Sequence, residues 1–192
     1  MKDHSISVDQ DRYSTYIVAK NLDTTTVKAS TQFYKTTLRY DMIFTKAAAS
    51  SSDEKVKKLT REFNIHYRAC IGSFIYLLPT RVYLSYSVQK LAKFSSNPGK
   101  VHFEGLLNLF SYIRYNKTLG LTHYANITDA PIFDLLRQHS IKTDNKLMDF
   151  SDSSWQDFPD TGRSTGALII FYQGGPIDHG THVPGQVSQS RE

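Results

Sequence analysis

The sequence predicts an α+β fold, in which a mostly helical region to about residue 145 precedes three antiparallel strands at roughly 146–154, 166–173 and 176–188. Two observations favour this fold class. Apolar residues recur at helical spacing before residue 145, whereas short apolar runs separated by polar turns follow it. With 192 residues and 40% hydrophobic content, the chain can bury one core or two small ones.

The first 22 residues predict a short strand and then a helix. Ile6 and Val8 alternate as in a strand, and Asp9 or Asp11 lies near the start of the helical spacing that follows. Residues 23–52 are rich in Thr, Ser and Ala and indicate a linker or a poorly ordered loop. We therefore place the first domain boundary at residue 52.

Residues 53–145 predict several helices. Ser52 is a suitable N-cap for the first of them. Asn97 as cap and Pro98 at the first helical position predict the start of a longer helix that ends near Gly120. A weak strand, a short helix around Pro131 to Gln138 and a polar connector complete this region. The other helical stripes are Val56, Leu59 and Phe63; Ile71, Phe74, Ile75 and Leu78; and Val88, Leu91 and Phe94.

Charge is distributed unevenly around the net value of +5. Residues 1–145 hold 20 Lys and Arg against 12 Asp and Glu, whereas residues 146–192 hold 3 against 6. This is typical of a phosphate-following surface beside a cation site, although unrelated solvated faces would give the same pattern. A groove along a nucleic-acid backbone could be lined by Lys90, Lys93, Lys100, Arg114 and Lys117. The tyrosines that could stack on bases, or simply pack, are Tyr86, Tyr112 and Tyr115.

Cysteine use and hydropathy indicate where such a chain would work. The single cysteine, Cys70, excludes an internal disulfide and is expected to be a small core residue in a reducing compartment. No apolar run reaches the length of a membrane span, and the first residues do not form a signal peptide. We expect no membrane partner and an intracellular location, in the cytoplasm or the nucleus.

One carboxylate stands out in the C-terminal region. Asp152 lies on a predicted strand among small hydroxyl residues, ahead of a polar turn at 161–166 and the apolar run 167–172. A rigidly held acid with small neighbours leaves room for a metal ion and a phosphate. This stretch therefore predicts a site, or half of one.

Several short motifs here occur in the order and spacing found in Ty1/copia-type retrotransposon polyproteins. The start of their ribonuclease H domain resembles Asp152-Ser153-Ser154-Trp155, then Gly162-Arg163-Ser164-Thr165-Gly166, then Gly174-Gly175-Pro176-Ile177. Their connection region is similar to Tyr67-Arg68-Ala69-Cys70-Ile71-Gly72-Ser73-Phe74-Ile75-Tyr76-Leu77, and the segment after the polymerase palm loosely resembles Gln10-Asp11-Arg12-Tyr13. The chain departs from the family at Val82-Tyr83-Leu84, where Pro-Asp-Ile is usual.

This resemblance implies a reverse transcriptase thumb-like segment and linker at 1–52, a connection region at 53–145, and a truncated, incomplete ribonuclease H-like domain at 146–192. An intact relative is an RNA-directed DNA polymerase and ribonuclease H that cuts the RNA strand of an RNA–DNA hybrid with two Mg²⁺ ions. The resemblance implies that Asp152 is a catalytic metal ligand. It also implies that Glu192, which lies one residue earlier than in the family pattern, is the displaced second catalytic metal ligand. The nucleic-acid-binding candidates are Arg81, Lys90, Lys93, Lys100 and Arg163.

The polymerase carboxylates and the later nuclease acids of the family do not occur in this sequence. We therefore expect the chain to be a fragment of a transposable element. We expect this fragment to be catalytically inactive, to hold no functional Mg²⁺ and to bind RNA–DNA hybrid weakly. Whether it is an enzyme is left open at this point. The alternative is a non-catalytic basic module that binds or packs with a partner. A chain without any function is the third possibility.

Three other motifs have simpler interpretations. Asp160-Thr161-Gly162 matches the aspartic-protease triplet without its apolar flanks. His179 and His182 have a spacing that could bind zinc, but a polar hairpin explains them better. Gly174-Gly175-Pro176 indicates a turn between strands.

Overall fold

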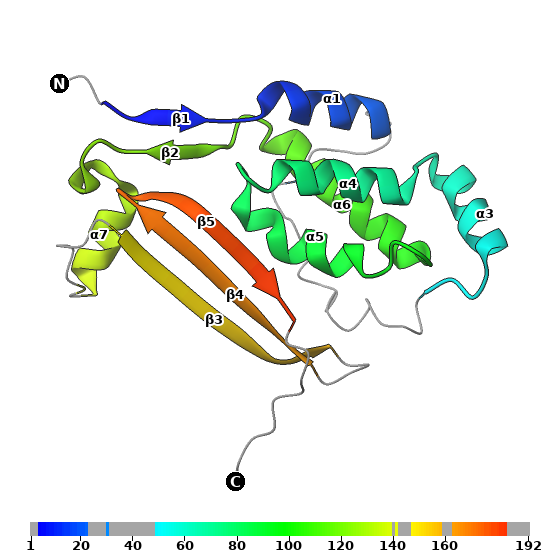
Figure 1. Ribbon diagram of the computed structural model, residues 1–192. Helices are drawn as coiled ribbons and strands as arrows, with labels where there is room; N and C mark the ends of the chain where they lie inside the picture. The colour runs from blue at the N-terminus through cyan, green and yellow to red at the C-terminus, as the bar shows by residue number, and fades with distance from the viewer. Residues whose placement is uncertain are drawn as a thin grey trace, which may run out of the picture.

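The computed structural model describes residues 4–22, 30, 49–139, 141, 147–158 and 163–183, and for 154–158 it describes the backbone alone. A body of packed helices lies beside a three-stranded antiparallel sheet (Figure 1). The α+β class predicted from the sequence is confirmed, as is the antiparallel order of the three C-terminal strands.

The helices lie close to the positions that periodicity predicts. Pro131 occupies the start of α7, where its fixed φ favours the first helical turn. At α3 the Ser52 side chain accepts a hydrogen bond from the Lys55 N–H at 3.4 Å, and Asn64 ends the helix in the left-handed region with φ 52°. The helical segments are α1 (Asp11–Asn21), α3 (Asp53–Phe63), α4 (Tyr67–Leu77), η2 (Val82–Leu84), α5 (Ser85–Ala92), α6 (Lys100–Tyr115), η3 (Ile127–Asp129) and α7 (Pro131–Gln138).

The start of α6 corrects one prediction. The helix begins at Lys100 with Gly99 as N-cap, two residues after the predicted start at Pro98. Ser50 accounts for the shift, because its N–H donates to the Asn97 carbonyl at 2.9 Å and its hydroxyl to the Pro98 carbonyl at 2.7 Å. These contacts from a distant segment hold the two carbonyls outside the helix. They could not be read from the local sequence.

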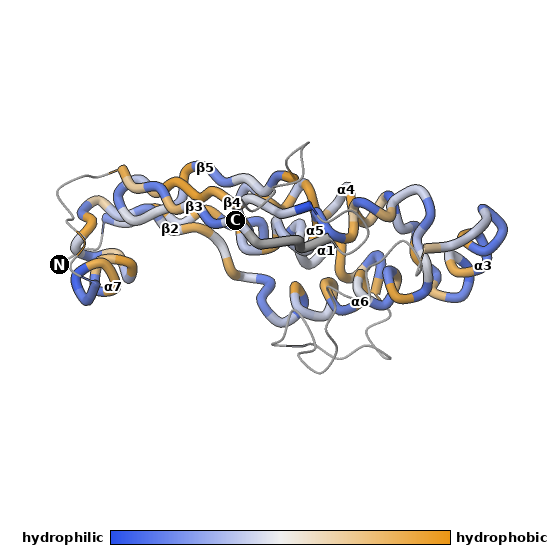
Figure 2. Tube along the Cα trace, turned by 90° about the horizontal axis from the view of Figure 1, so that it is seen from below, coloured by the Kyte–Doolittle hydropathy of each residue, from blue (hydrophilic) through white to orange (hydrophobic). Residues whose placement is uncertain are grey.

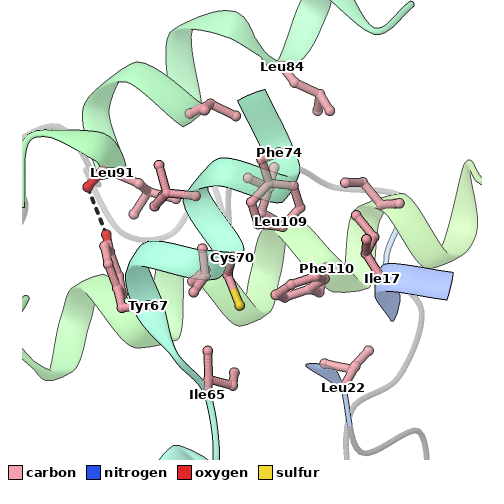
Figure 3. Packing of buried hydrophobic residues seen from close by; sticks show 14 of the residues in the cluster. Ile17, Leu22, Ile65, Tyr67, Cys70, Phe74, Leu84, Leu91, Leu109 and Phe110 are labelled. Carbon is pink, nitrogen blue, oxygen red and sulfur yellow. Dashed lines mark hydrogen bonds between the residues drawn. The ribbon is translucent and has the colours of Figure 1, made fainter. Parts of the chain in front are cut away.

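The main hydrophobic cluster lies in the helical body, and Ala130 and Leu136 at α7 are buried outside it. Phe74, Phe103 and Phe110 are fully buried, and the rings of Phe74 and Phe110 lie 4.6 Å apart (Figure 3). Cys70 is also buried, as predicted, and donates its S–H to the Asn21 side chain at 3.4 Å. Ile17 and Leu22 belong to the same cluster. Residues 11–22 therefore share one core with residues 65–113, across the predicted domain boundary at residue 52.

The C-terminal sheet has the order β3-β4-β5, formed by Leu147–Phe158, Arg163–Tyr172 and Gly175–His182. Tyr172 pairs with Gly175, so the β4–β5 turn has two residues, Gln173 and Gly174. Both have positive φ, 51° and 75°, as in the tight turns whose twist suits a hairpin. The turn predicted at Gly174 is confirmed. A second, two-stranded sheet pairs β1 (Ile6–Val8) with β2 (Leu121–His123).

The sheet meets the helical body through β5, which contacts α5, whereas β3 forms the outer edge (Figure 1). Two hydrogen bonds tie β5 to α5. Ser85 Oγ and His179 Nδ1 are 3.0 Å apart, and the Gln89 amide donates to the Thr181 carbonyl at 3.0 Å. Hydrophobic stretches continue along the sheet, which lies at the opposite end of the molecule from α3 (Figure 2). The sheet also contacts β2 through β5, and its β4–β5 turn lies against Ala130 at the start of α7.

Candidate nucleic-acid interface

Asp152 lies in the middle of β3, as the sequence predicts, and pairs with Ala167 on β4. Its side chain is exposed, and Oδ1 accepts a hydrogen bond from the Ser153 N–H at 2.8 Å. The small neighbour Ala167 leaves space above the carboxylate. Asp152 is therefore accessible and held on a strand.

A pocket of about 350 Å³ adjoins Asp152 where β3, β4 and β5 face η2 and α5. Its walls are mostly apolar and include the rings of Tyr83, Tyr86 and Phe150. The polar residues that line it are Ser85, Ser151, Asp152, His179 and Thr181. Since the hydrogen bonds from Ser85 and Gln89 join its two sides, the pocket is formed by the fold itself.

Two-metal hydrolysis needs several acids that converge on the ions. Asp152 is the one carboxylate among the described residues that line this pocket. Within the described ranges there is no group of three or more His, Cys, Asp or Glu side chains that could hold a metal ion. Glu192, the second predicted metal ligand, and the triplet Asp160-Thr161-Gly162 lie outside the described residues.

The two histidines of the possible zinc motif do not converge. They are three residues apart on β5, so their side chains point to opposite faces of the sheet. His179 contacts Ser85, whereas the His182 ring lies against Gly166 on β4, where an added Cβ would come within 2.5 Å of Cε1. This arrangement agrees with the polar hairpin favoured from the sequence.

Arg81, a predicted nucleic-acid contact, is fully buried. Its guanidinium donates to the Asn116 carbonyl at 2.6 Å and to the Lys117 carbonyl, at the C-terminal end of α6. It also donates to the Ser14 hydroxyl and to the Tyr83 hydroxyl, each at 3.0 Å. Burial raises the pKa of Tyr83, so this hydroxyl stays protonated. In this conformation Arg81 joins α1 to the end of α6 and does not face solvent.

The remaining predicted basic residues are dispersed. Lys90 is 2% exposed, and its ammonium lies 5.2 Å from the centre of the Tyr86 ring. Lys93 and Arg163 are exposed, the latter at the start of β4. Lys100 begins α6, whereas Arg114 and Lys117 lie at its other end, about 20 Å away at the usual helical rise. They do not line one short groove.

Three lysines gather in a second pocket, of about 570 Å³, between α3 and the start of α6. Lys55, Lys58 and Lys100 line it together with one acid, Glu62. Lys100 Nζ is 4.0 Å from Glu62 Oε1, but both side chains are largely exposed, so this ion pair leaves Lys100 available to other anions. We call Lys55, Lys58 and Lys100 the lysine cluster.

Sequence reasoning found Lys100 but missed Lys55 and Lys58. Their three-residue spacing places both on one side of α3, which is a signal that could have been noticed. Their proximity to Lys100 comes from the packing of α3 on α6, where the rings of Phe63 and Phe103 stack, and no local pattern reveals it. Sequence reasoning likewise missed Ser85 and assigned His179 only to a hairpin.

Comparison with known protein families, with characterised proteins and with solved structures finds no match. None of the described helices is both long and apolar enough to span a bilayer.

Proposed function

We propose that this chain derives from a Ty1/copia-type retrotransposon reverse transcriptase and ribonuclease H, has no nuclease activity, and binds nucleic acid through its phosphate backbone. The resemblance of its motifs motivates the origin. Asp152 on the first strand of an antiparallel three-stranded sheet, beside a small residue on the second, is the arrangement that the resemblance implies. An RNA–DNA hybrid is the expected partner.

The lysine cluster is the observation that supports binding best. Three lysines line one pocket, where Glu62 is the one acidic residue among the described lining residues. Lysines that neutralise phosphates release counterions, which supplies most of the affinity of sequence-independent binding. Phosphate-backbone contacts of this kind need neither metal ions nor base recognition. Nucleic-acid binding can therefore persist without catalysis.

Binding is tested by measuring the affinity of the whole chain for a labelled RNA–DNA hybrid at several salt concentrations. The variant Lys58→Gln/Lys100→Gln should bind more weakly, and the slope of log affinity against log salt should fall by about 0.9 for each lysine removed. The matched control is Lys20→Gln/Lys57→Gln, which removes the same charge from residues outside the pocket. Equal losses in both variants, or no binding by any chain, would contradict the proposal.

Nuclease activity is tested separately, by incubating the hybrid with Mg²⁺. We expect no cleavage, because Asp152 is the one carboxylate among the described residues of the pocket and cannot by itself hold two ions in the catalytic geometry. Asp152→Asn should accordingly change nothing. Cleavage that this substitution abolishes would show that the site is complete and that the inactivity proposal is wrong.

A second function, a packing module that works with a protein partner, is favoured by the exposed apolar residues of the sheet. Leu147, Tyr172 and Ile177 are 57%, 46% and 54% exposed. A partner on this sheet would leave the lysine cluster unaffected. Salt-independent association with a protein and none with nucleic acid would favour this alternative.

A further inference from the structure

We propose that the pocket between the sheet and α5 binds an unpaired nucleobase that carries an exocyclic amino group, such as adenine. This inference deepens the proposed function. The choice of a nucleobase, and not another aromatic ring, rests on that function. The size of the pocket is the first argument. At about 350 Å³ it lies at the lower end of the range for small-ligand pockets, which suits one ring system and not an extended cofactor.

The second argument is the nature of the walls. Tyr83 comes from η2, Tyr86 from α5 and Phe150 from β3, so aromatic residues line the pocket from three separate elements. Bases stack on such rings whatever their sequence, because every base has a π-face. Phe150 is itself held edge-on by Phe171, at a ring distance of 5.8 Å, and it is 39% exposed, so it can stack on a further ring without moving.

The third argument is charge. No lysine or arginine is among the described residues that line this pocket, so it offers no cation to a phosphate group. Asp152 offers an exposed carboxylate that repels phosphate and accepts hydrogen bonds from amino groups. Ser85, His179 and Thr181 add further polar groups. A neutral aromatic ring with an N–H donor fits this lining better than an anion does.

The pocket and the lysine cluster would then have separate tasks. They lie toward opposite ends of the helical body, the pocket beside the sheet and the cluster between α3 and the start of α6 (Figure 1). The cluster would hold the backbone of a strand regardless of its sequence. The pocket would hold a base only where the strand is unpaired, because the faces of paired bases are covered by stacking on their neighbours.

The test uses nucleosides, which carry no phosphate, so that the result is independent of the lysine cluster. Saturation-transfer NMR on the whole chain should show magnetisation reaching the ring protons of adenosine, with an affinity in roughly the millimolar range. Uridine, which has no exocyclic amino group, should give a clearly weaker signal. The adenosine signal should fall at least several-fold in Phe150→Ala, and in Asp152→Asn the preference over uridine should disappear.

The control is Tyr115→Ala, which removes an aromatic ring that is 57% exposed and lies outside the pocket. It should leave the adenosine signal unchanged. No transfer to adenosine, or equal loss in Tyr115→Ala and Phe150→Ala, would overturn the pocket assignment. If the pocket assignment fails while hybrid binding still depends on Lys58 and Lys100, the proposed function stands without it. Adenosine contact without hybrid binding would keep the pocket and overturn backbone binding.

Discussion

The helical body and the C-terminal sheet contain similar apolar residues but place them in opposite surroundings. Phe74, Phe103 and Phe110 of the body have no exposed surface, whereas Leu168 and Tyr172 of the sheet are 37% and 46% exposed. The body is therefore stabilised mainly by side-chain packing, and the sheet mainly by the hydrogen bonds between its strands and by its contacts with α5, β2 and the start of α7. Strands can thus be well formed without contributing to the core.

The largest expected effect comes from removing a central core ring. Phe110→Ala should lower the free energy of unfolding by about 3–5 kcal/mol, because the side chain is fully buried and leaves a cavity. The matched change in the sheet, Leu168→Ala, should cost less than about 1 kcal/mol, since much of that side chain already contacts water. Chemical denaturation of both variants measures the contrast, and comparable losses would contradict it.

The next largest effect concerns Arg81. Its fully buried guanidinium donates to Asn116, Lys117, Ser14 and Tyr83, so Arg81→Met would remove the donor from two part-buried carbonyls just after α6 and from the Ser14 hydroxyl. We expect a loss of about 2–4 kcal/mol. Arg68→Met is the control, because Arg68 is exposed and donates from Nε to one carbonyl, that of Ser95. Denaturation of the two variants should separate them, and equal stability would argue against a structural role for Arg81.

A third effect depends on pH. Burial lowers the pKa of His102 to about 4. The neutral His102 ring accepts a hydrogen bond from the Gly99 N–H at 2.8 Å and stacks on the Phe94 ring. The unfolded chain takes up this proton near pH 6.5, so the stabilisation is complete above that pH and is lost as pH falls toward 4. We expect a loss of about 2 kcal/mol over this window. His102→Gln should flatten the pH profile of the unfolding free energy, and an unchanged slope would contradict this assignment.

The smallest effect tests the attachment of the sheet. Ser85→Ala removes the hydroxyl that lies 3.0 Å from His179 and should make opening of β5 easier by about 1 kcal/mol, with little change in global stability. Hydrogen exchange of the β5 amides measures this opening. Ser73→Ala is the control, because Ser73 bonds only within its own helix, to the Ala69 carbonyl. Faster exchange in the control but not in Ser85→Ala would refute the attachment.

Local signals predicted most of the fold. The Ser52 cap, Pro131 at the start of α7 and the apolar spacing of α4 each act within a few residues, so the sequence shows them directly. The three strands were also placed within a few residues where the structure describes them, although the predicted end of the third lies beyond the described residues. The start of α6 was misplaced because Ser50, almost fifty positions away, holds Asn97 and Pro98.

The candidate sites were less predictable for the same reason. Asp152 was visible from its strand and its neighbours, but the pocket beside it needs Ser85 and Tyr86 from a distant helix. The lysine cluster joins α3 to α6 across more than forty residues. Arg81 shows the converse, since a basic residue predicted to contact nucleic acid is buried as a link between α1 and the end of α6. Long-range packing decides which charges reach the surface.

The most direct measurement is hydrogen exchange of the whole chain with and without a fully paired RNA–DNA hybrid. Backbone binding at the lysine cluster predicts slower exchange at α3 and at the first turn of α6, and little change at β3, because paired bases cannot enter the sheet pocket. Protection confined to β3–β5, or none anywhere under conditions where the hybrid is bound, would contradict the assignment of nucleic-acid binding to the helical body.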